Sequence, residues 1–430
     1  MRIISSQEFK KTDLDKFLNR GKSDLSSIVS SVQQIVKNVK ENGDVALMDY
    51  TNKFDKVSLK PSTLRVSETE IKQAYTKLNQ KQIDALQNAA DNIAIFHKKQ
   101  IKAKWTMQTS EGVTLGQVMR PLASVGVYAP GGKATYPSSV LMSAIPAKVA
   151  GVDRVIVCSP PRQGEDISSA LLVAADIAGV DEVYRVGGAQ AIAAMAYGTD
   201  SMKPVAKIVG PGNVYVTAAK IEVSRDVAID VPAGPSEVLV IADETANPAY
   251  VAADLLAQAE HDPQAWAILV TCSKKIANDV QKQITIQLKT LSRTPIIESS
   301  LQKGLIITTK DIDEAIALSN LIAPEHLQIQ TKEPNAVFSK IRNAGAVFLG
   351  RYSPVSFGDY SSGLNHVLPT AGYAKIYSGL SSLDFVKTMN FLECTKEGFD
   401  NLKETAVTIA EMEGFDAHAK AVSIREEKEE

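Results

Sequence analysis

The chain has 430 residues, of which 44% are hydrophobic and 22% are charged, and its formal net charge at pH 7 is −2. This composition is typical of a globular protein with sizeable cores, and the length exceeds the ~100–200 residues of one domain, so we expect two or more folding units. The balanced charge argues against a nucleic-acid-binding or membrane-surface protein, and no window approaches the ~18 unbroken apolar residues of a membrane span.

Up to about residue 120, the apolar pattern predicts helices. Apolar residues recur at helical spacing from Ile28 to Val39, and Asn42-Gly43 then supplies a stop signal. A second stripe runs from Ile83 to Ile93 and continues to His97. We therefore interpret His97 as a partly buried helix residue.

From about residue 122, short apolar runs alternate with helix-like segments. The first series contains the runs SVGVYAP, RVIVCSPP, EVYRVGG and AKIVGPG, and the second contains EVLVIAD, WAILVTC, GLIITT, HLQIQ and AVFLG. Such βα series imply parallel sheets with helices on their faces. The sequence thus predicts an α/β fold with two Rossmann-like parallel-sheet units of related design, flanked by helical N-terminal and C-terminal segments. The two series meet at PAGPSE, whose prolines and glycine mark a boundary.

The cysteines indicate a reducing compartment. Cys158, Cys272 and Cys394 are widely spaced, form no CxxC pair, and the first two each close an apolar run. This pattern favours buried structural thiols over a catalytic role. The residues MRIISSQEFKK contain no apolar core of signal-peptide length. We expect a soluble, cytoplasmic protein.

Histidine is sparse, and its placement is informative. Of five histidines, four lie in polar, turn-flanked settings beside possible ligands or bases. These four are His261, His326, His366 and His418, and the neighbouring groups are Gln258, Glu325, Asp359 and Glu413. Because histidine is the commonest metal ligand and titrates near neutral pH, the pattern indicates an enzyme with a metal site and a general base.

Three of these residues suggest a metal site. Gln258 and His261 are three positions apart in a predicted helix and would share a face. Asp359 lies in the glycine- and serine-rich stretch SFGDYSSGLNH, and a loop there could complete a ligand set. Imidazole nitrogen with carboxylate or amide oxygen suits zinc or a similar first-row ion rather than calcium. The alternative is that Gln258 and His261 are ordinary surface or packing residues and bind no metal.

Glu325 and His326 follow Pro324 at the start of a predicted strand. The side chains of neighbouring residues in a strand point to opposite faces, but at the start of the strand both can reach a cleft. One could activate water while the other carries a substrate proton. The alternative is a helix-to-strand turn with two exposed polar residues.

Three glycine turns follow successive strands of the first series. GPGNVY follows a strand and opens a helix, which is the context for binding phosphate on helix-terminal N–H groups. Tyr215 occupies the third glycine position of a dinucleotide fingerprint, so the match is partial. VYAPGGKATYPSS and VGGAQAI are the other two turns. Each alone is consistent with a simple tight turn, but together they indicate a cleft at the carboxyl ends of the strands. The sequence contains no P-loop, GxSxG or HExxH motif.

At this point the motifs match a known family. VGVYAPGGKATYPSSVLM, VGGAQAIAA, VGPGN, DVPAGPSEVLVIAD, LLAQAEH, APEHL, GDYSSGLNHVLPT and EGFDAHAKAV resemble, in this order, the histidinol dehydrogenase family, and the resemblance covers nearly the whole chain. It implies the last two steps of histidine biosynthesis, in which L-histidinol is oxidised through L-histidinaldehyde to L-histidine with two NAD⁺. It also implies one zinc ion per subunit.

The resemblance also implies roles for single residues. The zinc ligands would be Gln258, His261, Asp359 and His418, with His326 as the base and Glu325 as the water-activating group. Substrate would contact these four ligands, His326, Ser236, His366 and Glu413, and NAD would contact Tyr128, Gln190 and Asn213. The family forms an intertwined homodimer in which the segment bearing Glu413 and His418 completes the partner's site. Asp262 departs from the glycine that is common in the family and adds a charge beside a ligand.

The pattern and the resemblance together give the expected domains. We expect an N-terminal helical arm over 1–23 and a first α/β domain, with the metal and catalytic residues, over 24–128 plus 237–380. A second α/β domain on the NAD side would cover 129–236. A helical C-terminal segment would cover 381–430, with its apolar stripe from Phe399 to Ile409.

Two other function classes fit part of the pattern. A zinc hydrolase would use the same ligands with Glu325 as the base on water and would need no nucleotide, so the three glycine turns argue against it. A non-catalytic metal- or nucleotide-binding scaffold would leave the Glu325–His326 pair unexplained.

Overall fold

The computed structural model describes residues 1–20, 26–102, 104–131, 136–162, 166–231 and 234–426. The chain divides into two compact units. The first unit comprises residues 1–100 and 122–385, and the second comprises 101–121 and 386–430. None of the helices in the described part of the chain is both long enough and apolar enough to cross a bilayer.

The first unit contains a parallel six-stranded sheet, called the first sheet below. Its strand order is β1 (Arg2–Ser5), β11 (Leu305–Thr308), β10 (Trp266–Thr271), β9 (Glu237–Ala242), β12 (His326–Gln330) and β13 (Ala346–Leu349). Every residue of β9 is buried, as expected for a strand whose two faces are both covered by helices.

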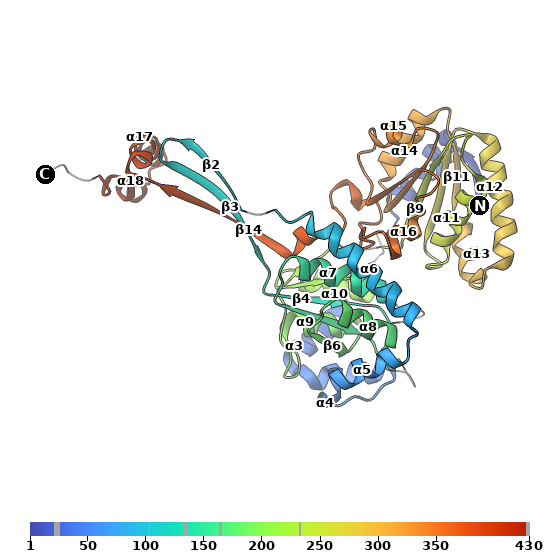
Figure 1. The fold of residues 1–430 in the computed structure, drawn as a ribbon, viewed down its shortest axis with the longest axis horizontal. Coiled ribbons are helices and arrows are strands. Elements are labelled where there is room, and N and C mark those ends of the chain that lie inside the picture. The colour runs from blue at the N-terminus through green and yellow to red at the C-terminus, as the bar shows by residue number, and fades with distance from the viewer. Residues whose placement is uncertain (21–25, 103, 132–135, 163–165, 232–233, 427–430) are drawn as a thin grey trace. The chain divides into compact units, whose positions relative to one another are not determined.

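Helices cover both faces of the first sheet (Figure 1). One core contains side chains of α11 (Pro248–Ala259), α12 (Lys274–Gln287), α13 (Thr294–Lys303) and the start of α16 (Val355–Tyr360). The other core contains side chains of α1 (Ser6–Thr12), α2 (Leu14–Leu18), α14 (Ile312–Ile322) and α15 (Pro334–Phe338).

The first unit also contains a parallel five-stranded sheet, called the second sheet. Its order is β6 (Glu182–Arg185), β5 (Arg154–Ser159), β4 (Ser124–Tyr128), β7 (Lys207–Val209) and β8 (Ala228–Ile229). One face is covered by α5 (Glu68–Thr76), α6 (Gln80–Lys98), α7 (Pro137–Val149) and α8 (Ser169–Ile177). The other face is covered by α3 (Ser26–Asp55), α9 (Gly188–Tyr197) and α10 (Val214–Val223), and the short helix α4 (Pro61–Leu64) contributes Leu64 to the same core.

The chain passes through the strands of the two sheets in the same spatial order. In the second sheet the chain starts at β4, moves outward through β5 and β6, and returns to the other side of β4 for β7 and β8. In the first sheet, apart from the added edge strand β1, it starts at β9, moves through β10 and β11, and returns to the other side of β9 for β12 and β13. The prediction of an α/β fold with two parallel-sheet units of related design is confirmed.

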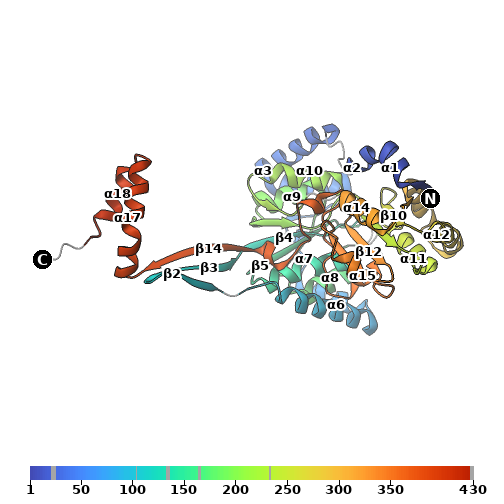
Figure 2. The ribbon, with the colours of Figure 1, turned by 90° about the horizontal axis from the view of Figure 1, so that it is seen from above.

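The second unit is an antiparallel ribbon followed by two helices (Figure 2). The ribbon consists of β14 (Val386–Cys394), β3 (Val113–Pro121) and β2 (Trp105–Ser110), and the helices are α17 (Lys396–Met412) and α18 (Asp416–Ser423). The helices of the C-terminal segment were expected, but the helical prediction was wrong for 105–121 and 386–394. Most residues of β2 and β14 are exposed, so these strands lack the continuous apolar run that marked the others.

The packing of the N-terminal third differs from the expected domain grouping. Strand β1 pairs with β11, so the described part of the expected arm, residues 1–20, contributes a strand as well as helices to the first sheet. Helices α3 to α6 pack on the second sheet, whereas the expected grouping joined 24–128 to 237–380. An apolar stripe shows that a helix covers a sheet, but it does not identify which of two similar sheets is covered.

Candidate active site

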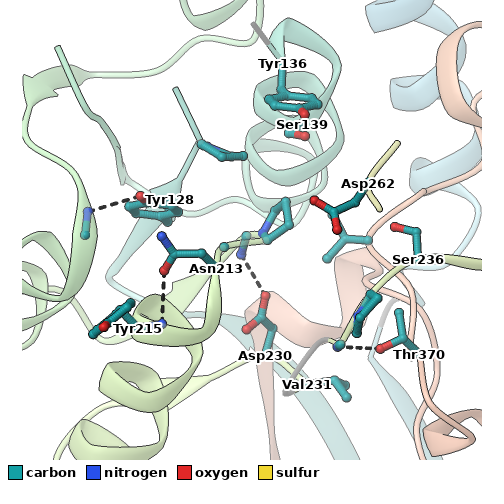
Figure 3. A pocket seen from close by; sticks show the side chains of 18 of the residues that line it. Tyr128, Tyr136, Ser139, Asn213, Tyr215, Asp230, Val231, Ser236, Asp262 and Thr370 are labelled. Carbon is teal, nitrogen blue, oxygen red and sulfur yellow. Dashed lines mark hydrogen bonds between the residues drawn. The ribbon is translucent and has the colours of Figure 1, made fainter. Parts of the chain in front are cut away.

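A cavity of about 1600 Å³ lies within the first unit, and all of its lining residues belong to that unit. On one side it is lined by residues that follow β4, β5 and β7, at the carboxyl edge of the second sheet. On the other side it is lined by Ser236, Glu325 and His326, where β9 and β12 begin at the amino edge of the first sheet. Figure 3 shows Tyr128, Asn213 and Tyr215 on one side of the cavity and Ser236, Asp262 and Thr370 on the other.

Two of the three glycine turns follow β4 and β7, where the strand order of the second sheet reverses, and the third follows the edge strand β6; residues 132–135 of the first turn lie outside the described residues. Tyr128 ends β4, and Gly210 directly follows the neighbouring strand β7. Gly210 has φ +113°, and a Cβ there would lie 2.2 Å from the carbonyl oxygen of Tyr128. Only glycine fits such a close approach of two backbones. A reversal point of this kind is where ligands bind in open α/β sheets, and the predicted cleft is present there.

The Gly210 turn is held by a buried ion pair that the sequence analysis did not identify. The backbone N–H of Gly210 donates to Asp230 Oδ2 at 2.7 Å, as drawn in Figure 3. Lys220, on α10, pairs with the same carboxylate and donates to the Gly210 carbonyl at 3.1 Å. Both side chains are buried. The pair therefore fixes both polar groups of the Gly210 peptide backbone.

The three residues expected to contact NAD all line this cavity. Tyr128 is buried, and its hydroxyl accepts from the N–H of Gly188, the first residue of α9, at 3.1 Å. Gln190, on α9, is buried, and its Oε1 has no hydrogen-bond partner among the described residues. Asn213 caps α10 by accepting from the N–H groups of Tyr215 and Val216. The amide oxygen of Asn213 is therefore committed to the helix.

His326 begins β12 and Glu325 directly precedes it, so the pair stands at the start of a strand as predicted, and both are buried at the cavity wall. The carboxylate of Glu325 accepts from the Glu237 N–H at 2.7 Å. His326 Nδ1 lies 3.1 Å from the carbonyl oxygen of Glu237. A carbonyl can only accept, so Nδ1 carries the proton and Nε2 is left as the acceptor of a neutral ring. His326 Nε2 has no hydrogen-bond partner among the described residues.

Two carboxylates act on the His326 imidazole. Nδ1 lies 3.6 Å from Glu325 Oε2, and Nε2 lies 3.6 Å from Asp359 Oδ1. Burial acts to lower the pKa of His326, but these carboxylates outweigh it and raise the pKa well above its ordinary value. Burial acts to raise the pKa of Asp359, but the imidazoles of His326, His366 and His261 lower it. Asp359 is therefore an anion surrounded by imidazoles.

Three of the four expected metal ligands, Gln258, His261 and Asp359, line the cavity. Helix α11 ends at Ala259, so Gln258 lies in its last turn and His261 lies just beyond it, not on the same helical face as expected. Asp359 is in the short helix α16 rather than in a loop. Gln258 is buried, and its Nε2 has no hydrogen-bond partner among the described residues.

The donor types in this group suit a first-row divalent ion, because they combine an amide, an imidazole and a carboxylate. No group of three or more His, Cys, Asp or Glu side chains that could hold a metal occurs in the part of the chain that the structure describes. Gln258 is not a residue of those types, so the expected ligands that line the cavity are two residues of those types and one amide. The first unit thus offers three donors.

The remaining expected substrate contacts fall into two places. Ser236 and His366 line the cavity. His366 Nε2 lies 3.3 Å from Ser139 Oγ, and its Nδ1 lies 3.2 Å from the backbone oxygen of Asp359. Burial lowers the pKa of His366. Glu413 and His418 lie in the second unit, at the end of α17 and in α18, and both are exposed.

Comparison with known proteins gives a consistent picture. Residues 18–426 match the family model described as histidinol dehydrogenase. The chain is 50% identical to the histidinol dehydrogenase of Methanothermobacter thermautotrophicus over 97% of this chain and 98% of the relative. It is 48% identical to that of Vibrio parahaemolyticus over 100% and 99%. The crystal structure of the enzyme from Elizabethkingia anophelis matches with a TM-score of 0.92 and 42% identity, covering 99% of this chain and 97% of that chain.

Proposed function

Because the chain belongs to the histidinol dehydrogenase family and is therefore an oxidoreductase, we propose that it oxidises L-histidinol to L-histidine through L-histidinaldehyde. Two NAD⁺ would accept the hydrides, and each subunit would use one zinc ion. The observation that carries the proposal is the buried Glu325–His326 pair, which shares one cavity with Asp359 and with the glycine turns of the second sheet.

The stoichiometry of the proposed reaction determines which catalytic groups the protein must provide. Histidinol, two NAD⁺ and one water give histidine, two NADH and three protons, so two hydrides leave the same carbon. The aldehyde must add water before the second hydride can leave. The site therefore needs a proton acceptor, a group that activates water, and a cavity that retains the aldehyde.

His326 is proposed as the proton acceptor in both oxidations, a role that needs the neutral ring and therefore a cation that offsets the carboxylates raising its pKa. Its Nδ1 donates to the Glu237 carbonyl, which leaves Nε2 facing Asp359 as the basic atom. Glu325 is proposed to activate water, since one carboxylate oxygen accepts from the Glu237 N–H and the second is available. General acid–base groups held in this way typically contribute about 10²–10⁴-fold to the rate.

Gln258, His261 and Asp359 are proposed to hold the zinc ion, together with His418 of the partner subunit. When bound, zinc would orient the substrate and offset the charge of Asp359. Ser236, His366 and the partner's Glu413 would bind the rest of the substrate. The cavity would also bind NAD. Tyr128, Gln190 and Asn213 would position this cofactor beside the Gly210 turn.

We also propose a homodimer whose C-terminal segments are exchanged. The support is that Glu413 and His418 are exposed on a separate unit, while the cavity of the first unit offers three metal donors. We propose a reducing, cytoplasmic location because Cys158, Cys272 and Cys394 are unpaired thiols. Cys158 is buried as predicted, Cys272 is half-buried and Cys394 is exposed.

The subunit exchange has a direct test. Dimers carrying only His418→Asn are mixed with dimers carrying only His261→Asn, and subunit exchange is verified. If each site takes His261 from one subunit and His418 from the other, hybrid dimers regain one intact site and their activity returns. Absence of recovery after verified exchange would show that each site is built within one chain.

The activity itself is tested by following NADH absorbance with histidinol and NAD⁺. Formation of NADH is expected with wild-type protein, and a variant with Glu325→Gln is expected to stop at the aldehyde level because water addition slows. A zinc hydrolase built from the same ligands would produce no NADH, and a binding scaffold would bind nucleotide without turnover.

A further inference from the structure

Glu237 is a buried carboxylate that the proposed chemistry does not use. It is the first residue of β9, is 1% exposed, and lies beside the start of β12. Its Oε1 accepts from the backbone N–H of Glu325 at 3.2 Å, and its own N–H donates to Glu325 Oε2 at 2.7 Å. Its carbonyl oxygen accepts from His326 Nδ1. One residue therefore contacts the backbone and side chain of Glu325 as well as the ring of His326.

Arg20 neutralises this carboxylate from the N-terminal segment. Its Nε and Nη2 donate to Glu237 Oε2 and Oε1 at 2.5 Å and 2.7 Å, and both side chains are buried. Nη2 also donates to the carbonyl of Ile322 at 3.1 Å, and Nη1 donates to that of Phe17. The guanidinium group stacks on the ring of Phe17 at 4.1 Å. Only a planar fork of donors can make these contacts together.

The Arg20–Glu237 ion pair contacts both ends of the turn that places Glu325 and His326 at the cavity. Helix α14 ends at Ile322, Ala323 has φ +52°, and His326 begins β12. Arg20 holds the carbonyl at the start of this turn, and Glu237 holds the N–H of Glu325 near its end. A left-handed alanine is strained and persists only where its surroundings fix it. The ion pair supplies two of those restraints.

We propose that the Arg20–Glu237 ion pair positions the Glu325–His326 pair for catalysis by fixing the turn over residues 322–326. Arg20 and Glu237 are positioning residues, because they act through Glu325 and His326 and touch no reacting atom. The inference rests on the catalytic role proposed for those two residues. A buried ion pair contributes little net stability compared with apolar side chains of similar size, so a purely stabilising role gives it no clear advantage.

The chain offers a matched control in the Lys10–Glu314 pair. Lys10 lies on α1 and Glu314 in the first turn of α14, so this pair also links the N-terminal segment to α14. It touches neither β9 nor the turn over 322–326. Lys10→Met therefore removes another ion pair made by the N-terminal segment, without removing a restraint on the Glu325–His326 pair.

The test measures kcat and both KM values for Arg20→Met, Glu237→Gln, the double variant and Lys10→Met, in zinc-loaded dimers. We expect kcat to fall by about 10–100-fold in each Arg20 and Glu237 variant, because misplacement by about 1 Å can cost ~10²-fold. KM for NAD⁺ should stay within about twofold, because Tyr128 and the Gly210 turn are untouched. The double variant should lose no more than the worse single variant, since the two restraints depend on one ion pair that either substitution breaks.

A second readout does not depend on turnover. Hydrogen exchange at the amide of Glu325 should accelerate in Arg20→Met and Glu237→Gln but not in Lys10→Met. If both variants fold and keep kcat within twofold of wild type, or if the losses in the double variant multiply, the proposal is overturned. Wild-type activity with histidinol tests the proposed function separately, because exchange at Glu325 reports on the turn even if that activity is absent.

Discussion

Gly210→Ala probes the reversal point of the second sheet. Alanine at φ +113° is strained by about 1–2 kcal/mol. An added Cβ would lie 2.2 Å from the Tyr128 carbonyl oxygen, whereas ordinary contacts begin at 3.4 Å. The backbones of β4 and β7 must therefore separate by about 1 Å, which moves Tyr128 relative to the turn that precedes Asn213. We expect the Kd for NADH and KM for NAD⁺ to rise by ~10–100-fold.

Gly350→Ala is the matched control for this substitution. Gly350 has φ +83°, but an added Cβ would meet no described atom within 4 Å. The variant therefore carries the same kind of backbone strain without the collision. Fluorescence titration with NADH should give wild-type affinity for Gly350→Ala and weakened affinity for Gly210→Ala. Equal affinities for the two variants would refute nucleotide binding at the Gly210 turn.

Three further predictions follow from the cavity and the core beside it. His326→Asn should lower kcat by about 10²–10⁴-fold and leave zinc content intact, and near-normal turnover would remove His326 as the base. His261→Asn should lower zinc occupancy, measured by atomic absorption after dialysis, and full occupancy would remove His261 from the ligand set. Burial raises the pKa of Asp254 to about 6, so the folded state favours the protonated acid and loses stability as pH rises from about 4 to about 6. Asp254→Asn should therefore stabilise the protein against urea at pH 8 by up to ~3 kcal/mol more than at pH 4, and an equal effect at both pH values would contradict this.

The architecture of the first unit could be predicted because most of its strands are buried on both faces. β9 is apolar from Val238 to Ala242 and β10 from Trp266 to Val270, and turn residues bound both runs, so the two strands are easily recognised in the sequence. The ribbon of the second unit could not be predicted in the same way. Trp105 and Met107 on β2 and Leu392 on β14 are exposed large side chains, so no core face imposes a regular pattern on their strands.

The site could be predicted in part, because its residues combine local and long-range signals. The glycine turns and the Glu325–His326 pair carry local signals, since each stands at the end or start of an apolar run. The approach of Gly210 to Tyr128 depends on the pairing of β7 with β4, which local sequence does not encode. The Arg20–Glu237 pair joins residues separated by 217 positions, and in the sequence Glu237 is only a charged residue before an apolar run.

The reaction stoichiometry tests the central claim most directly. A limiting amount of L-histidinol is incubated with zinc-loaded protein and excess NAD⁺ until absorbance is constant, and the products are separated. Two NADH and one L-histidine should form per histidinol, and His326→Asn protein should form almost none. One NADH with accumulated aldehyde, or no NADH from wild-type protein that binds both ligands, would contradict the four-electron oxidation proposed for this cavity.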